Sequence, residues 1–225
     1  MLVSASPTPY DLRFMLFGFP VRVHPAFWII ALLLGGDSRP EVALVWVGAV
    51  FLSILVHELG HALVQRAYRG RPEIVLYALG GVAAAPGVEE NWWKNILIAL
   101  AGPFAGFALA GLVYGLKEAF GMPAAPLGQY FVSYLIGINL IWGVINLVPI
   151  WPLDGGHVAR ELLVRFLPAY KGIYASLWLS IVCAAGAAAF LFVQTGSLFN
   201  LMIFGLLGYQ NYQALVAYRA SRGGW

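Results

Sequence analysis

Long apolar stretches constrain this chain more than any other feature of its sequence. A helix needs about 20 apolar residues to cross a bilayer, and five stretches reach that length: Val42–Gln65, Ile96–Leu116, Tyr130–Val148, Ile173–Val193 and Leu198–Tyr218. A sixth, Pro25–Gly36, is shorter. Hydrophobic residues make up 61% of the 225 residues and charged residues only 10%, whereas soluble domains carry roughly a quarter charged residues. The chain must therefore fold with lipid as part of its solvent.

The distribution of Lys and Arg predicts the orientation. If six spans cross with the N-terminus inside, eleven of the 13 basic residues lie in inner segments, and only Arg39 and Lys117 lie outside. Basic residues accumulate on the cytoplasmic side, so we expect six transmembrane helices with both termini cytoplasmic. Omitting the short first span would place the N-terminal arginines outside. The length predicts a single domain, residues 1–225. The net charge of +3 is too small to indicate a nucleic-acid partner.

Two segments have strand character. The β-branched and aromatic run Ile74–Tyr77 is followed by Gly80-Gly81 and then Val82–Ala85, a pattern that predicts a hairpin between the second and third spans. The N-terminal stretch Phe14–Val23 has a similar composition. Both are too apolar for ordinary loops, although an interfacial loop is the alternative for each. We therefore expect an all-α membrane fold of six helices with a small membrane-embedded β-sheet.

One span carries the sequence His57-Glu58-Leu59-Gly60-His61. Residues four apart share a helix face, so His57 and His61 can bind one ion together, and zinc is the usual ion for this spacing. Glu58 is rotated by about 100° from His57 and can reach the open position of that ion. There it can act as a general base and acid towards water. The bland alternative is a helix with two hydrogen-bonded histidines.

A catalytic zinc site usually has a third protein ligand. Asp154 is the best candidate, because the predicted topology places it at the same cytoplasmic depth as the two histidines. His157 and His24 are weaker candidates. The alternative for Asp154 is an Asp-Gly turn residue that caps the following helix.

The segment before Asp154 has its own logic. Pro149 and Pro152 end the preceding helix and extend the chain, which allows Asp154 to point sideways at a metal. Asn146 still lies on that helix and could donate a hydrogen bond to a developing oxyanion or to the substrate backbone. Asn139, further up the same span, is expected to form an interhelical hydrogen bond.

Taken together, these motifs resemble the site-2 protease family of intramembrane metalloproteases. The resemblance rests on HELGH in one span, Ala101-Gly102-Pro103 in the next, and the segment from Asn146 to Gly156 in another. It implies that His57, His61 and Asp154 bind one Zn²⁺ per chain, that Glu58 is the general acid and base, and that Asn146 lies near the active site. It also implies that the strands hold an extended substrate by strand addition. The sequence shows neither a PDZ nor a CBS domain.

The resemblance implies a zinc endopeptidase that cleaves a membrane-tethered protein in or near a transmembrane segment, as in regulated intramembrane proteolysis. The expected location is a lipid bilayer, a prokaryotic plasma membrane, with the active site towards the cytoplasm. A metal-ion transporter and a catalytically inactive relative that binds membrane substrates are the alternatives. Substrate, activating signal and oligomeric state have no indicator in the sequence.

Overall fold

The computed structural model describes residues 7–35, 39–77, 80–84 and 91–221. Its chain divides into two compact units. The first unit comprises Met1–Glu90 and Ala101–Val144, and the second comprises Asn91–Leu100 and Ile145–Trp225. Each unit is described by itself below.

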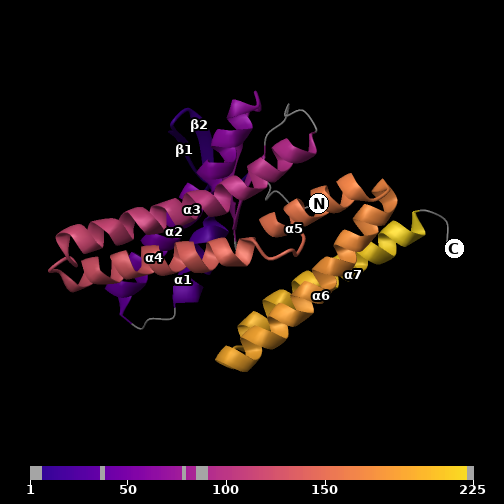
Figure 1. Ribbon diagram of the computed structural model, residues 1–225. Helices are drawn as coiled ribbons and strands as arrows, with labels where there is room; N and C mark the ends of the chain where they lie inside the picture. Colours follow the sequence, from indigo (N-terminus) through magenta and orange to yellow (C-terminus); the bar gives the residue numbers. More distant parts are fainter. Residues whose placement is uncertain (1–6, 36–38, 78–79, 85–90, 222–225) are drawn as a thin grey trace. The chain divides into compact units, whose positions relative to one another are not determined.

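A four-stranded sheet belongs to the first unit (Figure 1). Its strands are β1 (Leu12–Leu16), β2 (Phe19–Val23), β3 (Glu73–Tyr77) and β4 (Gly80–Ala84), in the spatial order β1-β2-β3-β4. The β1–β2 and β3–β4 pairs are antiparallel hairpins, and β2 and β3 run parallel. Both predicted strand segments are thus confirmed as parts of one small sheet.

The two hairpins differ from the prediction in detail. The stretch Phe14–Val23 is interrupted by a two-residue turn at Phe17 and Gly18, with φ of 48° and 80°. Positive φ at both central residues is the geometry that matches the twist of a tight hairpin. Gly80 and Gly81 lie within β4 rather than in a turn. The predicted strand end at residue 85 lies outside the described residues.

The sheet packs on α1 (Pro25–Gly35) and α2 (Pro40–Ala67). Pro40 opens α2, where the missing N–H of proline costs nothing. Five strand side chains are no more than 2% exposed, and they form one apolar core with residues of α1 and α2. This core comprises Phe19, Val21, Val23, Ile74 and Leu76 with Phe27, Ala31, Val50, Ile54, Leu55 and Ala62.

Helices α3 (Trp92–Phe120) and α4 (Pro126–Asn146) lie side by side in Figure 1. They approach closely where Gly143 of α4 faces Phe107 of α3, since an added β-carbon there would lie less than 3.0 Å from the phenyl ring. Small residues permit such close contacts between membrane helices.

The second unit contains α5 (Asp154–Phe166), α6 (Ala169–Thr195) and α7 (Leu198–Ala220). Gly196 ends α6 with φ of 64°, and the Ser197 side chain caps α7 by accepting a hydrogen bond from the Asn200 backbone N–H. The short connection brings α6 and α7 side by side (Figure 1). A helix after Asp154 was expected only in the alternative in which Asp154 caps it.

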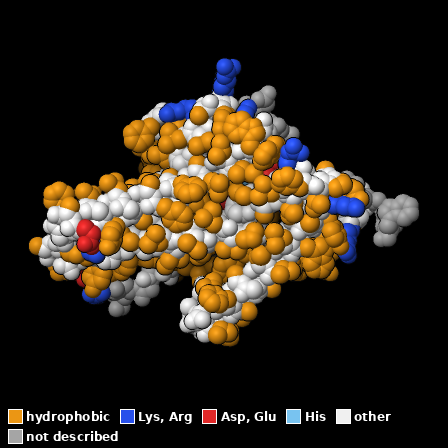
Figure 2. All heavy atoms as spheres, viewed as in Figure 1, with side chains coloured by type: hydrophobic (Ala, Val, Ile, Leu, Met, Phe, Trp, Pro, Cys, Tyr) orange, Lys and Arg blue, Asp and Glu red, His pale blue; other side chains and the backbone are white. Residues whose placement is uncertain are grey.

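The surface of the helices is apolar. Hydrophobic side chains cover much of α3, α4 and α6 in Figure 2, and large residues such as Leu112, Ile141 and Val182 are at least 60% exposed. Within the described residues, α2, α3, α4 and α6 are long and apolar enough to cross a membrane, and α1 is a shorter apolar helix. Exposing this much apolar surface to water is unfavourable, so the protein is an integral membrane protein.

Candidate metal centre

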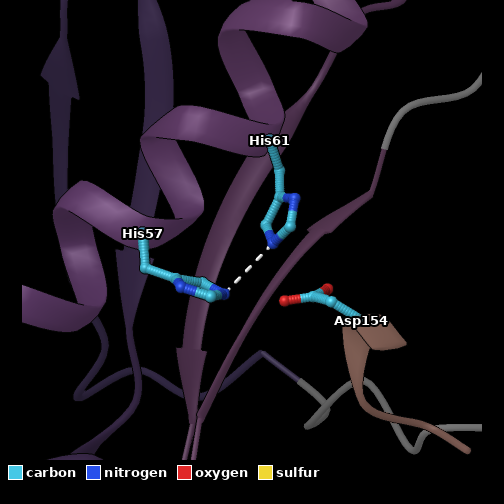
Figure 3. Close-up of side chains that lie close together, drawn as sticks. All are labelled: His57, His61 and Asp154. Atoms are coloured by element: carbon cyan, nitrogen blue, oxygen red, sulfur yellow. Dashed lines mark hydrogen bonds between the residues drawn. The ribbon is translucent and has the colours of Figure 1, made fainter. Parts of the chain in front are cut away.

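His57 and His61 lie on one face of α2, one turn apart, as their spacing predicts. Both are buried, with 4% and 8% exposed surface, and their Nε2 atoms are 3.2 Å apart (Figure 3). Two nitrogens bound to one tetrahedral zinc at 2.0–2.1 Å would be about 3.3 Å apart. The 3.2 Å contact is a hydrogen bond between the two rings, as in the alternative named in the sequence, and the same spacing suits two imidazoles that share one ion.

Gly102 of α3 leaves the space in front of these nitrogens open. An added β-carbon at this position would lie less than 3.0 Å from Nε2 and Cε1 of His61, and 2.8 Å from Nε2 of His57. In the sequence, Gly102 was singled out only as part of the motif that carries the resemblance. Its position in the Ala101-Gly102-Pro103 motif was the available indicator of a role beside the histidines.

Gly60, between the two histidines in sequence, allows α3 to approach. An added β-carbon on Gly60 would lie less than 3.0 Å from the carbonyl oxygen of Ala101 and from Cβ of Ala105. The backbones of α2 and α3 are thus in direct contact where the histidines lie. A larger side chain at position 60 would have to push the two helices apart.

A buried hydrogen bond fixes α2 one turn before the motif. Asn139 of α4 donates from Nδ2 to Oγ of Ser53 at 2.8 Å, and it also donates to the carbonyl oxygen of Leu135 at 2.8 Å. Gly106 of α3 leaves room for this amide, because an added β-carbon would lie only 3.2 Å from its Oδ1. The predicted interhelical role of Asn139 is confirmed.

Asp154 is the first residue of α5. The N-cap position belongs to Leu153, whose side chain makes no capping hydrogen bond, so the helix-capping alternative for Asp154 gains no support. One ligand atom each from His57, His61 and Asp154 lies within 4.8 Å of the others. Figure 3 draws these three side chains.

The two other histidines have different partners. Nδ1 of His24 accepts a hydrogen bond from the backbone N–H of Ala26, so His24 caps α1, and its ring packs edge-on against Tyr77. The ring of His157 packs on Trp151 at 4.1 Å between centroids. Neither joins the metal-ligand group found in the described part of the chain.

Glu58 and Asn146 are both buried. Glu58 follows His57 on α2 and is 5% exposed, while Asn146 is the last residue of α4 and is 8% exposed. A carboxylate in such an apolar helix is costly unless it has a partner or a chemical task. Glu58 directly follows one of the two paired histidines in the sequence.

Fold and site together define a class of protein: a polytopic membrane protein with a His–His–carboxylate group suited to a metal ion, next to a buried glutamate. The model of peptidase family M50 matches residues 45–122 and 116–185, together more than half of the chain. The chain belongs to peptidase family M50.

Named relatives agree with this family. Zinc metalloprotease MJ0392 of Methanocaldococcus jannaschii is 29% identical over 162 residues, covering 69% of this chain and 46% of the relative. Stage IV sporulation protein FB of Bacillus subtilis is 31% identical over 158 residues, covering 67% of this chain and 50% of the relative. The chain thus spans about half the length of these curated relatives.

A solved structure has the same fold. The site-2 protease from Methanocaldococcus jannaschii matches 92% of this chain and 95% of its own, with a TM-score of 0.63 and 22% sequence identity. The resemblance inferred from the sequence motifs is therefore confirmed at the level of family and fold.

Proposed function

We propose that this protein is a zinc-dependent intramembrane endopeptidase that hydrolyses a peptide bond in or near a transmembrane segment of a membrane-tethered protein. One observation carries the proposal: ligand atoms of His57, His61 and Asp154 lie within 4.8 Å of one another, and the buried Glu58 follows His57 on α2, a helix long and apolar enough to cross a membrane. The relatives named as metalloproteases and the solved site-2 protease support it. Regulated intramembrane proteolysis is the corresponding biological process.

His57, His61 and Asp154 would hold one zinc ion. Two imidazoles and one carboxylate form a ligand set that catalytic zinc sites use, and the 3.2 Å separation of the two Nε2 atoms fits it. Zinc in such a site supplies an acidified water and a Lewis acid for the substrate carbonyl.

Glu58 would move the proton. It takes a proton from the attacking water as the oxygen adds to the peptide carbonyl carbon, and it delivers that proton to the amide nitrogen as the C–N bond breaks. The products are a carboxyl group and an amine. Asn146 would donate a hydrogen bond to the carbonyl oxygen as negative charge develops there.

The same proposal includes six spans in one domain, residues 1–225, with both termini and the active site towards the cytoplasm of a prokaryotic plasma membrane. The pairing of β2 with β3 supports a crossing by α1. The chain leaves the sheet before α1 and returns to it after α2, whose 28 residues extend about 42 Å. The segment containing α1 therefore has to run back in the direction opposite to α2.

The test compares membrane-protein fragments in cells that carry the wild type, Glu58→Gln or Glu118→Gln. Glu118 is an exposed residue that pairs with Lys117, so its variant is a matched control. We expect Glu58→Gln to lower the cleavage rate by about 10²–10⁴-fold, the usual contribution of a general acid and base, and Glu118→Gln to cleave normally. Cleavage by Glu58→Gln at the wild-type rate would refute the proposal and would leave the metal-ion transporter open.

A further inference from the structure

The turn that carries Asp154 is held by hydrogen bonds from α6 and α7. The backbone N–H of Trp151 donates to Oγ of Ser180 on α6 at 2.9 Å. Nδ2 of Asn211 on α7 donates to the carbonyl oxygen of Trp151 at 2.6 Å. Ser180 and Asn211 are 2% and 1% exposed. Polar side chains buried in apolar helices are costly, so their use in binding the backbone N–H and C=O of one residue, three positions before Asp154, is informative.

The orientation of the Asn211 amide is unambiguous. Its Nδ2 also donates to the carbonyl oxygen of Leu207 at 2.8 Å, in the preceding turn of α7. Both neighbours are acceptors, so only the nitrogen of the amide can face them. Asn211 therefore links the backbone of α7 to the backbone of the turn. Together, Asn211 and Ser180 bind the backbone C=O and the backbone N–H of Trp151.

The Trp151 side chain is held as well. The guanidinium carbon of Arg160 lies 3.7 Å from the indole centroid, a cation–π contact. Nε of Arg160 donates to Oγ of Ser176 at 3.1 Å, and Oγ of Ser180 donates to the carbonyl oxygen of Ser176 at 2.9 Å. Trp151 thus contacts both Arg160 of α5 and Ser180 of α6, and Arg160 in turn bonds to Ser176 of α6.

Steric contact transmits this fixation to Asp154. An added β-carbon on Gly155 would lie less than 3.0 Å from the carbonyl oxygen of Leu147, and one on Gly156 would lie 2.5 Å from Ile150 and Trp151 backbone atoms. The first turn of α5 therefore packs directly on the backbone of the preceding turn. A shift of the Trp151 backbone would therefore have to move Asp154 as well.

We propose that Asn211 is a positioning residue: together with Ser180 it fixes the backbone N–H and C=O of Trp151 and so sets the direction of the Asp154 carboxylate. This inference rests on the proposed function, in which Asp154 is a zinc ligand. It gives α7 a task in the metal site, although α7 lies beyond residue 185, where the family match ends. Partners that orient a metal ligand typically contribute 10–100-fold to metal affinity.

The experiment uses the purified full chain in detergent, and measures zinc affinity by chelator competition and the visible absorption of bound Co²⁺. We expect Asn211→Leu to weaken zinc binding by about 10–100-fold and to alter the cobalt spectrum, which reports the ligand geometry. Asn200→Leu is the matched control, because Asn200 lies on the same helix. In the described contacts, the side-chain Nδ2 of Asn200 donates to Oγ1 of Thr195 and its backbone N–H donates to Oγ of Ser197. This control should bind both metals like the wild type.

Ser180→Ala is a second variant on a different helix, and Ser180→Thr, which keeps the hydroxyl, should restore the wild-type spectrum. Folded Asn211→Leu and Ser180→Ala proteins with unchanged zinc affinity and cobalt spectrum would overturn the inference. Failure of both variants to fold would also overturn it, because the network would then support the fold rather than one carboxylate. Metal binding by His57→Ala that equals metal binding by the wild type would instead refute the proposed function.

Discussion

Gly102 on α3 and His61 on α2 are so close that a β-carbon on Gly102 would lie less than 3.0 Å from Nε2 of His61. The atoms it would meet are the ends of two side chains, which can rotate away, rather than backbone. Gly102→Ala should therefore leave the helices in place and displace the imidazoles. We expect zinc affinity to fall by at least about 10-fold.

The matched control for this prediction is Gly111→Ala, two turns and more along the same helix, where an added β-carbon would meet nothing within 4 Å. It should bind zinc like the wild type. Equal zinc affinity in the two variants would show that Gly102 does not border the ion.

Gly60→Ala should instead lower the stability of the protein. Here the added carbon would meet the backbone of Ala101, which cannot rotate away. Overpacking of this kind costs about 1–3 kcal/mol, so we expect a lower free energy of unfolding in detergent. Gly48→Ala on the same helix, with nothing within 4 Å, is the control and should not be destabilised. Unchanged stability of Gly60→Ala would contradict the close contact of α2 and α3.

The buried pair of Ser53 and Asn139 should show a measurable coupling. Hydrogen bonds between membrane helices average about 0.6 kcal/mol and reach about 1.7 kcal/mol in double-mutant cycles. We expect a coupling in this range from Ser53→Ala, Asn139→Ala and the double variant, measured by unfolding in detergent. Independent effects of the two substitutions would show that the 2.8 Å bond contributes nothing to stability.

Zinc stoichiometry should separate ligands from bystanders. We expect His57→Ala, His61→Ala and Asp154→Ala each to lose bound zinc, because each removes one member of the group. His157→Ala should retain it, because that ring packs on Trp151 instead. Elemental analysis of the purified variants provides the measurement. Full zinc content in Asp154→Ala would require a different third ligand.

The N-terminal hairpin should loosen in acid. Hydrogen bonds from the Thr8 side chain and backbone, opposed by burial and assisted by Arg22, lower the pKa of Asp11. A lowered pKa in the folded state contributes stability above the unfolded pKa of about 4 and loses it as the pH falls below that value. The protection of the β1 amides against exchange, measured relative to the intrinsic exchange rate at each pH, should therefore decrease below about pH 4. Asp11→Asn should flatten this dependence, and an equally steep dependence in that variant would contradict the role of Asp11.

The sequence predicted those elements whose physics is local. Apolar length located the helices, and the four-residue spacing placed His57 and His61 on one face of α2. The tight turn at Phe17 and Gly18 was missed because phenylalanine rarely adopts positive φ. The short helix α5 was expected only in the alternative in which Asp154 caps a following helix, because its 13 residues are fewer than the roughly 20 that identify a membrane span.

Contacts between distant segments were harder to predict. Helical spacing does not distinguish Gly102, which borders the histidines, from Gly111, which has open space around it; only the Ala101-Gly102-Pro103 motif sets Gly102 apart. The bond from Asn211 to Trp151 joins residues 60 positions apart, and it depends on how the helices pack. Helical spacing cannot encode such a pairing.

The parallel pairing of β2 with β3 also sets an order of events during synthesis. Val21 is paired with Ile74, so the N-terminal hairpin has no third strand until α1 and α2 have been made. At 5–20 residues per second, the ribosome needs roughly 3–10 s for the intervening residues. During that interval the hairpin exposes an unpaired strand edge. The helix that bears the histidines is thus synthesised before the strand that completes the β2–β3 pairing.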